Sequence, residues 1–213
     1  MRVRLTSHIG QRINRELVVA ESLLQSVCPA VAIYGSARIA EDDPYYKQTF
    51  EVARALSQAG VSVISGGGPG LMEAANRGAQ AGFNGTSVGL NIHLSTEQEP
   101  NAYQDISIDF VHFAARKVAF CKHSKAAIAM PGGFGTLDEI FEVLTLMQTR
   151  KMPEIPALLY GREFWQGLLD WIRDQQLSRG LIGDDDFHKR LCLVDSPEEV
   201  LKALSGVVAQ ATR

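Results

Sequence analysis

MPGGFGTLDE, at residues 130–139, is the stretch around which this chain is organised. An apolar run at 126–130 leads into it and an apolar-periodic run at 140–147 follows, which predicts a strand, a glycine turn and a helix. The glycines permit a tight turn and let backbone N–H groups approach a ligand closely. We expect the helix to begin at about Thr136, where unpaired N–H groups and the positive end of the helix dipole favour an anion. The alternative is a turn with only a structural role.

Two acids, Asp138 and Glu139, follow within one turn of that helix start. Acids there can stabilise a helix start without any further role. A carboxylate beside a phosphate site would also suit chemistry on a phosphorylated sugar. Thr145 is predicted to lie two turns after Glu139 on roughly the same face, as a further contact. The candidate binding residues of the turn itself are Pro131, Gly132, Gly133, Phe134, Gly135 and Thr136.

A second unit of the same kind comes earlier, with a strand predicted at 61–64, the turn SGGGPG at 65–70 and a helix at 71–81. This unit lacks the G-x-G-x-x-G spacing of dinucleotide-binding folds in its proper setting, and it lacks the G-K-[ST] ending of a P-loop. Two glycine turns on one sheet indicate a mononucleotide or sugar phosphate held between them. Gly67 and Gly68 are therefore candidate contacts.

A strand predicted at 30–34 ends in a third small-residue turn, GSAR. Ligand sites of α/β folds lie at the carboxyl ends of the strands, where Ser36 can donate to a phosphate and Arg38 can pair with one. The alternatives are a helix or turn cap for Ser36 and a solvated side chain for Arg38. Glu73 and Asn76, near the start of the helix after the SGGGPG turn, are expected to have surface or capping roles.

A predicted helix at 113–124 carries Arg116 and Lys117 near its start, where the helix dipole disfavours cations. Local conflicts of this kind concentrate at functional sites. Arg116 can hold a phosphate or developing charge in a bidentate way, and Lys117 can act as a point charge. The alternatives are one surface cation and one cation paired with a neighbouring carboxylate. His112 and His123 are expected to be structural, because no second metal ligand lies at a matching spacing.

Strands and helices alternate along the chain, which predicts an α/β fold with one parallel sheet covered by helices on both faces. Residues 1–28 are expected to form a helical extension, with a helix at 11–27, and residues 29–213 a single domain. The polar loop at 93–103, which holds Glu97 and Glu99, is expected to close over a ligand. Further strands are predicted at 86–90, 106–110, 155–160 and 191–194, further helices at 44–59, 164–176 and 197–209, and a solvated acidic turn at 184–186.

The composition is that of an ordinary globular protein: 213 residues, 46% of them hydrophobic and 21% charged, with a formal net charge of −3. This charge lacks the basic character of a nucleic-acid-binding protein. Cys28, Cys121 and Cys192 are widely spaced and form no CxxC pair, which argues against a zinc site or disulfide framework and favours a reducing compartment. Without an apolar run of membrane-spanning length or a secretory signal, we expect a cytoplasmic protein that binds neither membranes nor metal.

Two motifs resemble the LONELY GUY family, the cytokinin-activating phosphoribohydrolases that are often labelled lysine decarboxylases. PGGFGTLDE at 131–139 matches the family's PGGxGTxxE, and Arg116-Lys117 matches its upstream Arg-Lys pair. SGGGPGLM at 65–72 is similar to the family's first glycine loop. The likeness spans roughly residues 30–160, and the flanking segments resemble a longer bacterial branch. Phe113 stands where many members have Met.

The resemblance implies a Rossmann-like fold, usually dimeric, with the site near the subunit interface. It implies hydrolysis of the N-glycosidic bond of a nucleoside 5′-monophosphate, such as AMP or a cytokinin riboside monophosphate, to free base and ribose 5-phosphate. Arg116 and Glu139 are the implied catalytic pair, and the loop from Gly132 to Thr136 would hold the phosphate. This scheme requires neither a metal nor a cofactor.

Two other classes of protein remain open at this point. A nucleotide or molybdenum-cofactor carrier would use the glycine turns without needing Arg116 and Glu139 together. A pyridoxal-dependent decarboxylase would need a Schiff-base lysine in a cofactor pocket. Lys117, Lys122 and Lys125 have no motif context of that kind.

Overall fold

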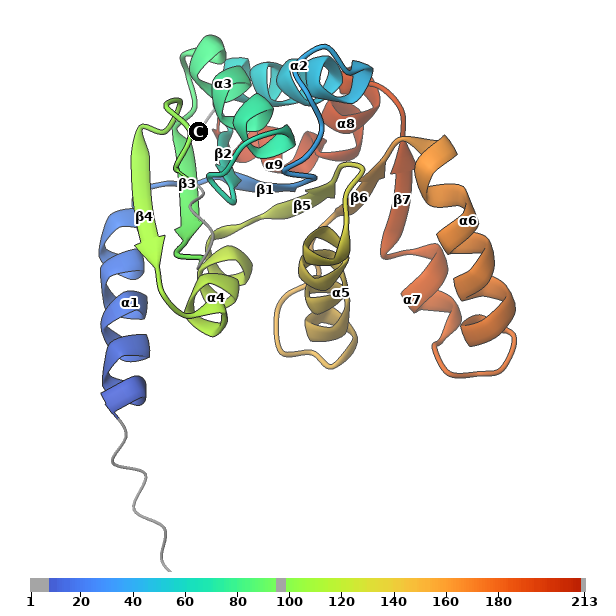
Figure 1. Ribbon diagram of the computed structural model, residues 1–213. Coiled ribbons are helices and arrows are strands. Elements are labelled where there is room, and N and C mark those ends of the chain that lie inside the picture. Colours follow the sequence, from blue (N-terminus) through green and yellow to red (C-terminus); the bar gives the residue numbers. More distant parts are fainter. Residues whose placement is uncertain (1–7, 95–98, 212–213) are drawn as a thin grey trace, which may run out of the picture.

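The computed structural model describes residues 8–94 and 99–211. The strands within these ranges are β1 (Ala30–Tyr34), β2 (Ser62–Ser65), β3 (Ser87–Ile92), β4 (Ile106–Phe110), β5 (Ala126–Ala129), β6 (Ala157–Tyr160) and β7 (Leu191–Val194). All seven of these strands pair in parallel in one sheet, in the order β4-β3-β2-β1-β5-β6-β7 (Figure 1). The predicted α/β fold with a parallel sheet is confirmed.

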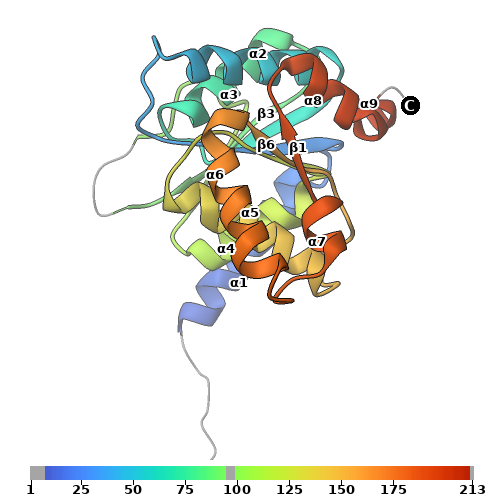
Figure 2. The ribbon, with the colours of Figure 1, turned by 90° about the vertical axis from the view of Figure 1, so that its right-hand side faces the viewer.

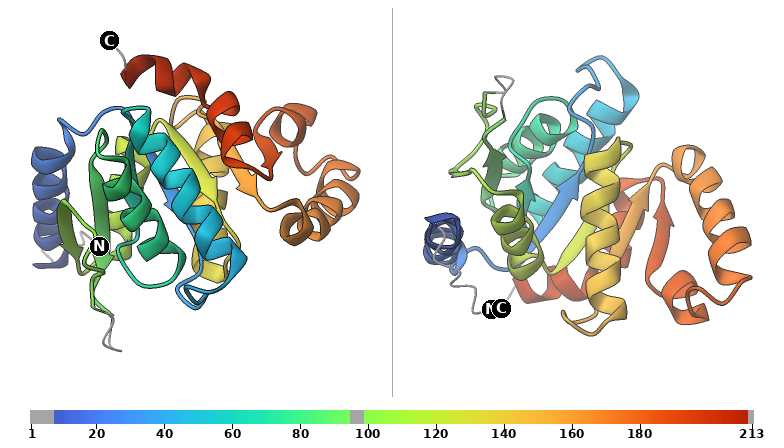
Figure 3. Two further views of the ribbon diagram at one scale, coloured as in Figure 1. Left: turned by 90° about the horizontal axis from the view of Figure 1, so that it is seen from above. Right: turned by 60° about the horizontal axis from the view of Figure 1, so that its bottom comes forward.

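Helices cover both faces of the sheet (Figure 2). One layer consists of α2 (Pro44–Gln58), α3 (Leu71–Gly82), α8 (Pro197–Ala203) and α9 (Ser205–Ala211). The other consists of α1 (His8–Leu24), α4 (Phe113–His123), α5 (Phe134–Gln148), α6 (Arg162–Ile172), which continues into a π-helical turn η1 (Arg173–Leu177), and α7 (Asp184–His188). Figure 3 shows α4 and α5 side by side in this second layer.

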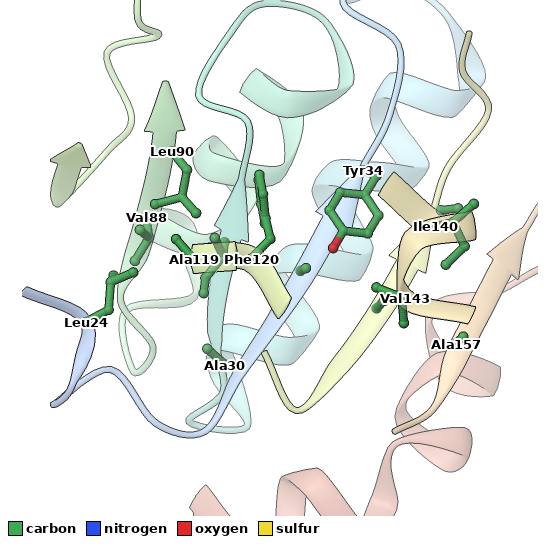
Figure 4. Close-up of a cluster of buried hydrophobic side chains, with 14 of the residues drawn as sticks. Leu24, Ala30, Tyr34, Val88, Leu90, Ala119, Phe120, Ile140, Val143 and Ala157 are labelled. Carbon is green, nitrogen blue, oxygen red and sulfur yellow. The ribbon is translucent and has the colours of Figure 1, made fainter. Parts of the chain in front are cut away.

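The central strands β1, β5 and β6 consist almost entirely of apolar residues, because both of their faces are covered. Along β1, Val31 and Ile33 join the cluster beneath α2 and α3, whereas Ala32 and Tyr34 join the cluster beneath α4 and α5. This alternation follows from the two-residue period of a strand. The Tyr34 ring packs edge-on against Phe120, with centroids 5.2 Å apart (Figure 4).

Five predicted boundaries need correction, the first being that of the N-terminal helix, which spans His8–Leu24 rather than residues 11–27. Helix α5 begins at Phe134 rather than Thr136, because Gly133 supplies the extended N-cap backbone (φ −95°, ψ −154°) and Gly135 is accommodated inside the helix. The acidic run at 184–186, predicted as a turn, is the first turn of α7, where the Asp186 carboxylate accepts a bond from the Gly183 N–H; Asp184 and Asp185 are exposed, as expected. The final helix is interrupted at the buried Leu204, and the helix predicted at 164–176 widens into η1. Glu97 lies outside the described residues.

The N-terminal helix packs against α4 and the edge strand β4 (Figure 1). Ala20 and Leu24 are buried in that contact. The Glu16 carboxylate pairs with His112, and Glu21 pairs with Lys122 and His123. Among the described residues, no helix is long and apolar enough to cross a membrane.

Candidate active site

A cavity of about 740 Å³ opens at the carboxyl ends of the central strands. From β1 the sheet continues through β2, β3 and β4 on one side and through β5, β6 and β7 on the other. Ligands of open α/β sheets bind where the strand order reverses in this way. The turns that follow β1, β2 and β5 all contribute to the cavity wall, so the structure brings the three predicted turns together.

Ser36 is the point at which the three turns meet. Its backbone N–H donates to Pro131 O at 3.1 Å, and its carbonyl accepts from the Leu71 N–H at 2.9 Å. Its hydroxyl oxygen accepts from the Arg38 N–H at 3.1 Å, as a turn cap does. Because an accepting hydroxyl still has its own proton, Ser36 retains a donor in the wall of the cavity.

The first glycine turn is held by amide side chains from the segment after β3. Gly67 O accepts bonds from the Asn101 N–H at 2.8 Å and from Gln104 Nε2 at 2.9 Å, and Asn101 Nδ2 also donates to Gly68 O. Gly67 has φ +74°, and a Cβ there would lie 1.9 Å from Asn91 Oδ1. Only glycine fits this position, so the closely packed turn forms a rigid part of the wall.

The second glycine turn opens α5 toward the cavity. Gly132, Gly133, Phe134, Gly135 and Thr136 all line it. The N-cap residue Gly133 offers no side chain to the first N–H groups of the helix, which have no intrahelical partner. A Cβ at Gly132 would lie 2.1 Å from Thr136 Oγ1, so this approach of chain to helix needs glycine. Unpaired N–H groups and the helix dipole make this end of α5 suited to an anion.

Arg116 and Glu139 face each other across the cavity wall, one from α4 and one from α5. Arg116 Nη2 lies 2.5 Å from Glu139 Oε1, and the two side chains are 10% and 13% exposed. The guanidinium also lies against the rings of Phe113 and Phe120, at 5.8 Å and 5.5 Å from their centroids. Its buried Nε has no hydrogen-bond partner among the described residues. Burial raises the pKa of the Glu139 carboxyl, and the charge of Arg116 opposes that rise.

Comparison with known proteins identifies the chain's relatives. The family described as "Possible lysine decarboxylase" matches residues 72–204. The cytokinin riboside 5′-monophosphate phosphoribohydrolase LOG1 of Arabidopsis thaliana is 30% identical over 171 residues, which span 77% of this chain and 76% of that protein. The chain belongs to the LONELY GUY family. The probable cytokinin riboside 5′-monophosphate phosphoribohydrolase LOGL6 of Oryza sativa subsp. japonica is 27% identical over 195 residues, which span 89% of this chain and 76% of that protein.

The fold extends beyond the LONELY GUY family. The structure of a molybdenum cofactor binding protein from Rippkaea orientalis has a TM-score of 0.62 to this chain at 21% identity, over 84% of this chain and 97% of that one. At this identity the likeness concerns the Rossmann-like fold alone.

Three residues predicted to contact a ligand are absent from the described residues that line the cavity: Lys117, Pro131 and Thr145. The Lys117 ammonium is instead bonded to Asp138 and Glu142. Pro131 contributes its carbonyl to the bond with Ser36. Thr145 is exposed and its hydroxyl donates to Phe141 O at 2.7 Å. The expectation that it shares a face with Glu139 is wrong, because six residues are about 1.7 helical turns.

Asn76 does not have the surface or capping role expected of it. It is fully buried, where its Oδ1 accepts from Ser65 Oγ at 2.6 Å and its Nδ2 donates to Ser87 Oγ at 2.9 Å. Glu73 accepts a hydrogen bond from the Tyr46 hydroxyl at 2.8 Å. Through its bonds to Ser65 and Ser87, Asn76 joins α3 to β2 and β3 beneath the first glycine turn.

The cavity wall contains residues that sequence patterns did not single out as contacts. One of them is Asn91, on β3, which is 6% exposed and lies beside Gly67. Glu99 and Pro100 also line the cavity, and they belong to the loop that was predicted to close over a ligand. A polar residue inside the apolar run of β3 was an available signal for Asn91. Among the described residues, no group of three or more His, Cys, Asp or Glu side chains is placed to hold a metal ion.

Proposed function

We propose that the protein hydrolyses the N-glycosidic bond of a purine nucleoside 5′-monophosphate, either AMP or a cytokinin riboside monophosphate, to the free base and ribose 5-phosphate. The observation that carries the proposal is the buried Arg116–Glu139 pair in a cavity that also contains the open amino end of α5. The relatives named as phosphoribohydrolases support the same class of reaction. The cavity volume of about 740 Å³ lies within the range of small-molecule sites.

The phosphate would bind the backbone N–H groups of Phe134, Gly135 and Thr136, with the Ser36 hydroxyl as a further donor. Fixing the phosphate orients the attached ribose before the reaction, which lowers the barrier when the same contacts hold the transition state. Glu139 lies in the second turn of the same helix. A phosphate at the amino end of α5 therefore directs the sugar toward this carboxylate.

Cleavage breaks the bond between C1′ and the base nitrogen, and the electron pair leaves with the base. The ribose acquires oxocarbenium character, as in glycoside hydrolysis, where carboxylates stabilise the transition state. In our proposal Glu139 braces the developing cation and takes a proton from the water that adds to C1′. Arg116 stabilises negative charge on the phosphate or the departing base, which takes up a proton as it leaves.

The decisive experiment is incubation of the purified protein with AMP and quantification of adenine by chromatography. Glu139→Gln should lose catalysis by about 10²–10⁴-fold while retaining nucleotide binding, since a positioned acid–base group contributes that much. Glu163→Gln, on the exposed amino end of α6, is the matched control and should retain the parent rate. Hydrolysis of AMP by Glu139→Gln at the parent rate would refute the assignment.

The alternative function is that of a carrier of nucleotide or molybdenum cofactor, because two solved structures with this fold are named as a molybdenum cofactor binding protein and a molybdenum cofactor carrier protein. Retention of intact AMP without adenine release would favour the carrier.

The described residues that line the cavity include no lysine, so the residues present do not support a pyridoxal-dependent decarboxylase.

The proposal extends to a cytoplasmic homodimer in which residues 1–28 are an extension of a catalytic domain at 29–213. Apolar side chains exposed on the neighbouring helices α1 and α4, including Val18, Val19 and Val118, are consistent with a second copy covering this side. Light scattering after size-exclusion chromatography tests the homodimer, and the mass of a monomer at micromolar concentration would contradict it.

A further inference from the structure

Two adjacent ion pairs join α4 to α5. Arg116 pairs with Glu139, and its neighbour Lys117 pairs with Asp138, the neighbour of Glu139. Lys117 Nζ lies 2.7 Å from Asp138 Oδ1 and 3.0 Å from Glu142 Oε2. The two helices are therefore joined by two neighbouring ion pairs. Arg116–Glu139 lies in the cavity wall, and Lys117–Asp138 lies outside it.

Lys117 is engaged on the outer side of this arrangement. Its side chain is only 21% exposed, whereas those of Asp138 and Glu142 are 59% and 31% exposed. Burial opposes its charge, but the hydrogen bonds to the two carboxylates outweigh burial and raise the pKa of Lys117. A cation near the amino end of α4 is unfavourable to the helix dipole, and these carboxylates offset that cost.

We infer that Lys117 is a positioning residue and not a substrate ligand: by bridging Asp138 and Glu142 it fixes α4 against α5 in the register that brings Arg116 to Glu139. The inference rests on the proposed function for its kinetic consequences. Its structural content, a link between the two helices that determines the environment of Glu139, stands apart from any substrate.

The charge of Lys117 also acts on Glu139. The groups that act on Glu139 are Arg116, Lys117 and Cys121 from α4, Asp138 from its own helix, and Tyr34 from β1, while Glu142 pairs with Lys117. Burial raises the pKa of Glu139; among its neighbours, Arg116 and Lys117 lower it and Asp138 raises it. Removal of the Lys117 ammonium leaves two carboxylates uncompensated, so the pKa of Glu139 should rise further. Removal of Asp138 and Glu142 should shift it in the opposite direction.

The test compares Lys117→Met, Lys117→Arg and the double variant Asp138→Asn/Glu142→Gln with the parent protein. Lys47→Met, an exposed lysine on α2, is the control. Lys117→Met should lower kcat for AMP by about 10- to 100-fold with little change in KM, since a misplacement of catalytic groups by about 1 Å can cost about 10²-fold. The acid limb of its pH–rate profile should move to higher pH, and that of the double variant to lower pH. Lys117→Arg should restore the parent behaviour.

A titration of the Glu139 carboxyl in the ligand-free protein, followed by carbon NMR of labelled glutamate, decides the inference without turnover. If the parent protein releases no adenine but the Glu139 pKa still rises in Lys117→Met and falls in the double variant, the proposed function fails and the inference stands. If Lys117→Met raises KM at unchanged kcat and leaves the Glu139 titration unaltered, Lys117 contacts the phosphate and the inference is wrong.

Discussion

The Glu16 carboxylate of the N-terminal helix accepts two hydrogen bonds from His112, from ring Nδ1 at 2.8 Å and from the backbone N–H at 3.3 Å. His112 is the N-cap residue of α4, yet its own side chain does not cap that helix. Glu16 thus supplies, from a distant part of the chain, a negative charge at the amino end of the helix that carries Arg116. The N-terminal helix is by this contact connected to the candidate active site.

Glu16→Ala is expected to lower the free energy of unfolding by about 1–3 kcal/mol, because it removes charge-assisted hydrogen bonds whose atoms are largely buried. Urea denaturation measures the change. Gln11→Ala, at an exposed position of the same helix, is the control and should alter stability by less than about 0.5 kcal/mol. Equal effects of the two substitutions would show that the contact with His112 contributes nothing specific.

Arg116→Met is expected to lower kcat/KM for AMP by a factor on the order of 10²–10³, as loss of a preorganised charge does. The guanidinium pairs with the Glu139 carboxylate and itself lies against the rings of Phe113 and Phe120, and methionine replaces only the apolar part of these contacts. Arg116→Lys keeps the charge but lacks the planar guanidinium, so we expect partial activity at most. Steady-state kinetics with AMP test both variants. Full activity of Arg116→Met would exclude a direct role for this residue.

When the pH is lowered, activity should begin to fall at a higher pH than it would if Glu139 had the pKa of an ordinary glutamate. Burial raises the pKa of Glu139, and the proposed reaction needs its carboxylate form, which exists only above that pKa. The acid limb of kcat/KM against pH reports this group in the free protein. A decline toward alkaline pH with a plateau at acidic pH would instead mean that Glu139 acts in its protonated form.

Gly67→Ala is expected to destabilise the protein by about 2–4 kcal/mol, combining the strain of a left-handed backbone with overpacking against Asn91. Gly167→Ala, inside α6 with no neighbouring atom in the way, should instead stabilise the protein by about 0.5–1 kcal/mol. Thermal unfolding distinguishes these opposite signs. Comparable stability of Gly67→Ala and the parent would mean that the turn can rearrange freely.

The sequence by itself determined the elements and their kind. Apolar runs of strand length, glycine turns and helical periodicity predicted each strand of the sheet to within two residues at either end, because parallel strands covered on both faces are mostly apolar. The turns predicted at 35–38, 65–70 and 132–136 were also recognisable, since small residues allow a chain to approach a neighbour closely, although Ser65 belongs to β2. The resemblance to the LONELY GUY family marked Arg116 and Glu139 as a pair.

Only the tertiary structure decided which of the marked residues share one cavity. Neighbouring side chains on a helix point in different directions, so Arg116 faces the cavity while Lys117 turns to Asp138 and Glu142 outside it. The burial of Asn76 and Asn91, and the link from Glu16 to His112, likewise depend on contacts between segments far apart in sequence. Sequence spacing reports local geometry, whereas the environment of a charge depends on every element that packs against it.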